Sequence, residues 1–191
     1  MTASCDGCAL CCKVLSVEEI DKPANRWCRA IHQTEHGRSC GIYSDRPAAC
    51  RVFECLWLAS QSRPGQEMQP ELRPDHSHVV FCMDFSVTGS EDVNPDLRVL
   101  FAHVDPDHPN AWRTPLPRLA IRTFLQRGGQ VIVIIGKRRI LLRRDQPPLF
   151  TTEADIQVAA AALAGRMRPG DLPPDMPTPT FDPVELMRRL G

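Results

Sequence analysis

The sequence CDGCALCC occupies residues 5–12 and spaces Cys5, Cys8 and Cys11 three residues apart, with Cys12 directly after the last of them. A tight loop with this spacing can direct several thiolates toward one centre. Three close cysteines and one distant cysteine are typical of iron–sulfur ligation, and a CxxC pair joined by two further ligands is typical of zinc. The array therefore predicts a metal or cluster centre near the N-terminus.

The adjacent pair Cys11 and Cys12 is the exception within this array. Neighbouring side chains diverge in most backbone conformations, so we expect these two thiols not to bind the same ion. Eight of the nine cysteines lie at or before Cys55, which permits one four-sulfur site with spare thiols or two complete sites. Buried structural cysteines and a disulfide network are the alternatives.

Bulk properties favour a cytoplasmic protein without a membrane span. The first residues lack a basic start followed by an apolar stretch, which a secretory signal requires. The longest apolar run, residues 131–135, is far shorter than the roughly 18 residues of a spanning helix. In a reducing cytosol, dense cysteines are more often metal ligands than disulfides.

A later block, CGIYSDRPAACRVFEC, occupies residues 40–55. Together with CDGCALCC and the pair Trp27–Cys28, it resembles the YkgJ-like CxxCxxCC cysteine-cluster family, which is described as zinc- or iron-chelating. The resemblance covers under a third of the chain and does not extend to Cys82. Flagellin lysine methylases have a similar cysteine motif associated with an iron–sulfur cluster, which favours a 4Fe–4S cluster over zinc as the cofactor.

The resemblance implies one set of metal ligands and leaves their division between sites open. The set comprises eight cysteines: Cys5, Cys8, Cys11, Cys12, Cys28, Cys40, Cys50 and Cys55.

Other residues of the motif predict support for such a centre. Arg46 and Arg51 are expected to offset the negative charge of the thiolates, or to pair with Asp45 and Glu54. Four apolar residues are expected to keep water from the sulfurs: Ile42, Tyr43, Val52 and Phe53.

Histidines offer further candidate ligands, because neutral imidazole binds zinc and iron. His32 and His36 lie between two cysteines and could replace a thiolate. A remote second site is a weaker hypothesis, built from His76, His78, His103 and His108.

The chain divides by composition into three parts. Residues 1–60 form the cysteine-rich module, residues 75–165 an α+β unit, and residues 166–191 a proline-rich tail, with a candidate linker at 61–74. The predicted fold class is α+β: a small irregular cysteine-rich module followed by a small sheet with one or two packed helices.

Within the second part, patterning predicts individual elements. Strands are expected at residues 78–85, 97–104, 131–135 and 140–142, with Gly136 in a hairpin turn, and helices at 117–127 and 153–164. Leu116, Ala120 and Phe124 recur every four residues and predict the buried stripe of the first helix.

Residues 111–144 contain nine basic side chains and no acidic one. This segment predicts a solvated face or a surface for a protein or anionic partner, with nucleic acid less favoured. A structural or electron-transfer metal protein is the leading hypothesis, ahead of a metal-dependent enzyme and a zinc-stabilised nucleic-acid-binding module. No catalytic residues can be assigned, because the sequence contains no nucleophile triad or phosphate-binding loop that we can place.

Overall fold

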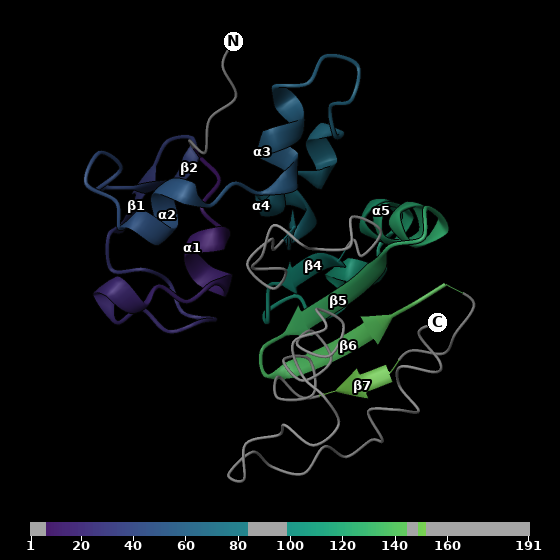
Figure 1. The fold of residues 1–191 in the computed structure, drawn as a ribbon. Coiled ribbons are helices and arrows are strands. Elements are labelled where there is room, and N and C mark those ends of the chain that lie inside the picture. Colours follow the sequence, from purple (N-terminus) through teal and green to yellow (C-terminus); the bar gives the residue numbers. More distant parts are fainter. Residues whose placement is uncertain (1–6, 84–98, 145–148, 152–191) are drawn as a thin grey trace, which may run out of the picture.

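The computed structural model describes residues 7–83, 99–144 and 149–151 (Figure 1). Three parts of the sequence-based prediction lie outside these residues: Cys5, the helix at 153–164 and the tail at 166–191. The described residues form helices and two sheets, so the α+β class is confirmed.

The cysteine-bearing part is built from short elements, in keeping with the irregular module that we expected. They are α1 (Cys11–Val14), η1 (Glu18–Ile20), the hairpin β1 (Ile31–Thr34) and β2 (Gly37–Cys40), α2 (Ala48–Val52) and α3 (Leu56–Gln61). Figure 1 shows α1, α2 and the hairpin gathered on one side of the molecule, with α3 between them and α5. Elements this short have little stability of their own, because nucleating a helical turn is costly.

The second sheet contains five strands in the order β3-β4-β5-β6-β7. Their bounds are β3 (Val79–Met83), β4 (Val99–Val104), β5 (Gln130–Ile135), β6 (Arg138–Leu142) and β7 (Leu149–Thr151). The pair β4–β5 is parallel and the other pairs are antiparallel. The predicted hairpin is confirmed at β5–β6, where Gly136 has a φ of 59°.

Helix α5 (Pro115–Gln126) crosses between the parallel strands β4 and β5 and covers one face of the sheet (Figure 1). The predicted stripe of Leu116, Ala120 and Phe124 packs against the sheet core, while Arg118 and Arg122 remain exposed. Two prolines lie in the first turn of α5, where the backbone N–H groups have no helical acceptor. The apolar period therefore predicted both the helix and its buried face.

The segment at 61–74 connects the two parts, as expected, but it also contributes to the core. It includes η2 (Pro70–Leu72), after which α4 (Pro74–Ser77) leads into β3. Leu72 is buried in the main core and Met68 packs against it. The sequence indicated a linker because this segment is rich in proline and charged residues. Its two core residues did not change that prediction, because they are isolated from any apolar run.

The opposite face of the sheet receives α1 and Phe53 of the cysteine-bearing part, whereas Leu56 and Trp57 of α3 pack against the core under α5. Alternate residues of β3 point to opposite faces, so Val79 belongs to the core under α5 while Val80 packs with Leu10 and Val14 of the cysteine-bearing part. Phe53 packs against the same cluster. No helix among the described residues is long and apolar enough to cross a membrane.

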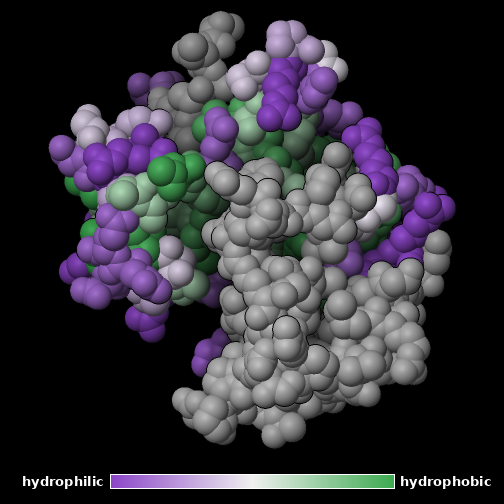
Figure 2. Space-filling model, viewed as in Figure 1, coloured by the Kyte–Doolittle hydropathy of each residue, from purple (hydrophilic) through white to green (hydrophobic). Residues whose placement is uncertain are grey.

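The surface of the cysteine-bearing part corrects one prediction. Ile42, Tyr43 and Val52 are exposed rather than packed around the sulfurs, and Val52 reaches 83%. Only Phe53, of the four apolar residues expected there, packs inward. In Figure 2, hydrophobic patches interrupt the hydrophilic surface on this side of the molecule.

Candidate metal centre

Cys12, Cys28 and Cys40 gather around Cys50. The sulfurs of Cys12, Cys28 and Cys40 lie close enough to Cys50 to raise its pKa, an effect that adds to the larger one of burial. Backbone contacts hold the surrounding segments together, since Cys28 N–H donates to the Cys12 carbonyl at 3.0 Å. Cys40 ends the hairpin and pairs across it with Ile31. Because Ile31 is only three residues after Cys28, this pairing brings the segment of Cys28 near Cys40.

Lys22 is a buried cation whose negative neighbours are sulfurs. It is 6% exposed, and its Nζ donates to the carbonyl oxygens of Lys13, at 2.9 Å, and Leu15. Burial lowers the pKa of Lys22, and the nearby cysteines oppose that shift. Among the described residues no carboxylate forms an ion pair with it. Because buried charges in proteins are usually paired, this arrangement favours thiolates around Lys22.

Cys11 and Cys12 interact with one another, and the expectation that they do not bind the same ion stays a prediction. Their thiols form a side-chain hydrogen bond, which is the largest cause of the lowered pKa of Cys12, about 7; Lys22 and Arg46 lower it further. Both residues lie in the first turn of α1, and the negative charge of either thiolate acts on Lys22.

The remaining described cysteines occupy other surroundings. Burial raises the pKa of Cys8 to about 12, and the charge of Asp75 adds to that rise. Cys55 precedes α3, and burial raises its pKa although backbone N–H groups of that helix donate to its sulfur. Cys82 is buried in the sheet with Phe101 and Ile132. No disulfide joins the cysteines of the described residues.

The spacing of the sulfurs bears on the kind of centre they fit. In the described part of the chain, no three cysteine sulfurs lie within 4.8 Å of one another. Tetrahedral zinc with bonds of about 2.3 Å would bring its sulfurs about 3.8 Å apart. A cluster of several iron and sulfide atoms holds its cysteines farther apart. The described residues therefore contain no preformed group of three sulfurs as close as those of a zinc–thiolate site.

The two arginines of the motif lie in different surroundings. Arg46 stacks its guanidinium on Tyr43, 3.6 Å from the ring centroid, and helps to lower the pKa of Cys12, as the charge-offset prediction requires. Arg51 instead lies near Glu19. The pKa of the Glu19 carboxyl is lowered mainly by hydrogen bonds from the N–H groups of Ala49 and Ala48, and the charge of Arg51 lowers it further.

The N-terminal loop is held against the hairpin by two glycines. Gly7 has a φ of 75°, and a Cβ atom at this position would overlap the carbonyl oxygen of His36. Gly37 is equally restricted, since its Cβ would lie 2.5 Å from the Gly7 carbonyl oxygen. This close backbone approach positions the loop that contains the CxxCxxCC array.

We expect Gly7→Ala to lower the free energy of unfolding by about 2–5 kcal/mol, combining about 1–2 for the left-handed backbone with about 1–3 for the overlap. Gly65→Ala is the matched control, because Gly65 has a φ of 78° and no heavy atom near its Cβ position. Denaturant unfolding of both variants measures the difference. Equal losses would show that the contact between the loop and the hairpin contributes nothing.

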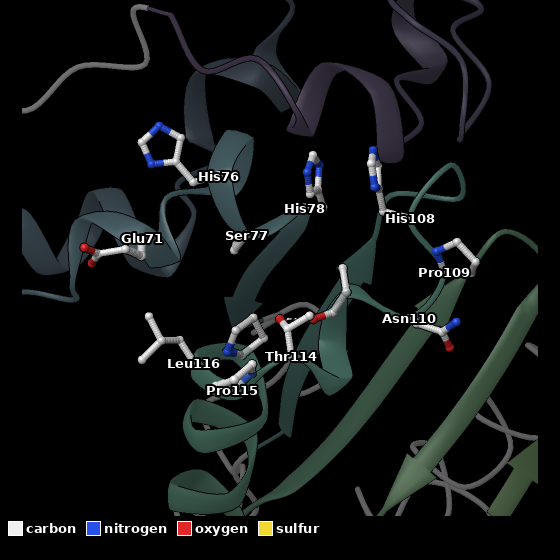
Figure 3. Close-up of a pocket in the computed structure, with 12 residues that line it drawn as sticks. Glu71, His76, Ser77, His78, His108, Pro109, Asn110, Thr114, Pro115 and Leu116 are labelled. Carbon is white, nitrogen blue, oxygen red and sulfur yellow. Dashed lines mark hydrogen bonds between the residues drawn. The ribbon is translucent and has the colours of Figure 1, made fainter.

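A second group of ligand atoms lies where β3 begins and β4 ends. His78 precedes β3, Asp105 follows β4, and Asp105 N–H donates to the His78 carbonyl at 2.9 Å. The rings of His78 and His108 stack with centroids 3.7 Å apart and planes 12° apart. Figure 3 shows the two rings side by side, with His76 farther away.

The structure therefore unites only two of the four histidines of the weaker hypothesis. Ligand atoms of His78, Asp105 and His108 all lie within 4.8 Å of one another. His103 lies within β4 opposite Val80, and His76 is not part of the group. His32 and His36, exposed on the hairpin, join no such group among the described residues.

Sequence reasoning missed three residues that organise these sites: Lys13, Lys22 and Asp105. Lys13 is 6% exposed and its Nζ binds Asp105 Oδ1 at 2.5 Å and Asp107 Oδ2 at 2.6 Å. The same ammonium lies 5.5 Å from the centroid of the Trp27 ring. A lysine directly after Cys12 was the available signal, but a charged residue beside a motif is usually exposed.

Comparison of the chain with models of protein families, with curated proteins and with solved structures gave no match.

Proposed function

We propose that this protein binds a metal centre, most favourably a 4Fe–4S cluster, through the thiolates of Cys12, Cys28, Cys40 and Cys50, with a structural or electron-transfer role. The observation that carries the proposal is Lys22, a buried ammonium beside Cys11, Cys12, Cys28 and Cys50, with no carboxylate ion-paired to it among the described residues. The resemblance of the motif to the cysteine-cluster family supports it independently.

The donor set fits the proposed group. Cysteine thiolates are the usual ligands of iron–sulfur clusters. The positive charges of Lys22 and Arg46 offset the negative charge of four thiolates, and such neighbours tune the potential of a bound centre. The cluster would supply a one-electron redox couple or a cross-link between the short elements. The likeness of the cysteine motif to that of flagellin lysine methylases favours this over the zinc alternative.

The proposed ligands come from α1, the segment before β1, the end of β2 and α2. None of these elements is longer than 5 residues. A centre joining all four segments would therefore hold together a part of the chain that has little regular structure of its own. Metal binding supplies folding free energy in many small modules of this kind.

We expect Cys50→Ser to lose the bound metal, because Cys50 lies close to each of the other three proposed ligands. Cys82→Ala is the matched control, since it removes a thiol from the sheet core and away from the centre. Metal content per chain after anaerobic gel filtration measures the difference. Retention of full metal content by Cys50→Ser would contradict the proposed ligand set.

A further inference from the structure

A second binding site can be argued from the group at the edge of the sheet. We propose that His78, Asp105 and His108 bind a divalent first-row transition-metal ion, separate from the cysteine centre. Two imidazoles and one carboxylate are the donor set of many non-haem iron(II) sites. Catalytic zinc sites use the same set when the carboxylate comes from a glutamate. Three protein donors leave coordination positions open.

The carboxylate of Asp105 is oriented for such a role. Asp105 is 5% exposed, and its Oδ1 accepts hydrogen bonds from Lys13 Nζ, at 2.5 Å, and from Asp107 N–H, at 3.0 Å. Its Oδ2 accepts no hydrogen bond from the described residues. A ligating carboxylate is commonly fixed in this way, with one oxygen hydrogen-bonded and the other available to the ion.

The backbone fixes the two histidines beside this carboxylate. His78 adopts the left-handed conformation, with φ 56° and ψ 24°, at the end of α4. His108 follows a turn in which its N–H donates to the Asp105 carbonyl at 2.9 Å. The stacked rings must rotate to bind one ion, because a bound ion lies near the plane of each imidazole and these planes are 12° apart.

A cavity adjoins this group. Its volume is about 620 Å³, and its lining includes His78 and His108 together with Glu71, Asn110 and Thr114 (Figure 3). A ligand entering this space would reach the open coordination positions. Polar side chains in the wall suit a small oxygen-bearing molecule or water.

The experiment uses the full chain with its cysteine centre loaded, titrated with Zn²⁺ alone at neutral pH. We expect one zinc ion per chain beyond the metal of the cysteine centre. Loss of a ligand in His78→Asn or His108→Ala should weaken binding by at least about 100-fold, since even residues that only orient ligands contribute about 10–100-fold. Asparagine is chosen at residue 78 because it tolerates the left-handed backbone.

Two controls separate this site from its surroundings. His76→Ala should bind the additional zinc normally, because His76 lines the same cavity and lies outside the group. Cys50→Ser should keep a zinc site that disappears when His108→Ala is added, so that failure of the cysteine centre is distinguishable from failure of this site.

The proposal is overturned if the wild-type chain binds no additional zinc. It is equally overturned if His76→Ala weakens binding as much as the other histidine variants, or if both His78→Asn and His108→Ala keep wild-type affinity. Should His78→Asn fail to fold, His108→Ala decides the question, because His108 is exposed on a turn.

Discussion

Replacement of Lys13 by methionine is expected to lower the free energy of unfolding by about 3–5 kcal/mol, the range for removing one partner of a buried ion pair. Lys13 and Asp105 are both 7% exposed in their side chains, and they join α1 to the end of β4. Methionine keeps the length of the side chain but leaves the Asp105 carboxylate buried without its cation. Denaturant unfolding of the full chain measures the loss.

Two further variants test this explanation. Asp107→Asn should cost only a small fraction of that loss, because the Asp107 side chain is 73% exposed and solvent screens its pairing with Lys13. Adding Asp105→Asn to Lys13→Met should recover part of the stability, since the unpaired charge is then absent. If Lys13→Met costs no more than Asp107→Asn, the buried pair does not hold the two parts together.

The second large effect is the loss of unfolding free energy in Lys22→Met, which should differ between the metal-loaded and the metal-stripped protein. A unit negative charge about 5 Å from the ammonium contributes about 3 kcal/mol at an effective dielectric constant of about 20. Metal-loaded protein should therefore lose about 3 kcal/mol more than metal-stripped protein. Both forms also lose the hydrogen bonds to the carbonyls of Lys13 and Leu15.

Thermal or denaturant unfolding of the loaded and stripped forms gives this difference directly. Lys137→Met is the matched control, because Lys137 is exposed in the β5–β6 turn, far in sequence from the cysteines. Lys137→Met should leave the free energy of unfolding of both forms nearly unchanged. Equal losses for Lys22→Met in the two forms would mean that no anionic centre lies beside Lys22.

Much of the sheet unit could be predicted because its signals are local. The four-residue apolar period identified α5 and its buried face, and Gly136 marked the turn between β5 and β6. β-Branched and aromatic residues placed β3 and β4 within a few residues of their observed bounds. Such patterns depend on neighbours in the sequence, so the rest of the fold is not needed to read them.

The sites depend instead on pairs that are far apart in the chain. Lys13 and Asp105 are 92 residues apart, and Asp105 lies just after the strand predicted at residues 97–104. The group formed by His78, Asp105 and His108 arises because β3 and β4 pair with Val79 opposite Val104. Individual strands were predictable, but their register was not.

The division of the cysteines shows the same limit. Their spacing predicted a centre, but only the fold separates Cys12, Cys28, Cys40 and Cys50 from Cys8, which lies beside Asp75.

The most direct test of the central claim is the content of iron, zinc and acid-labile sulfide in the untagged full chain, prepared without oxygen. One 4Fe–4S cluster predicts about four iron and four sulfide atoms per chain and a brown protein. If the protein contains zinc and no sulfide, the centre is a zinc–thiolate site and not a cluster. A chain that folds fully with neither metal would contradict the account.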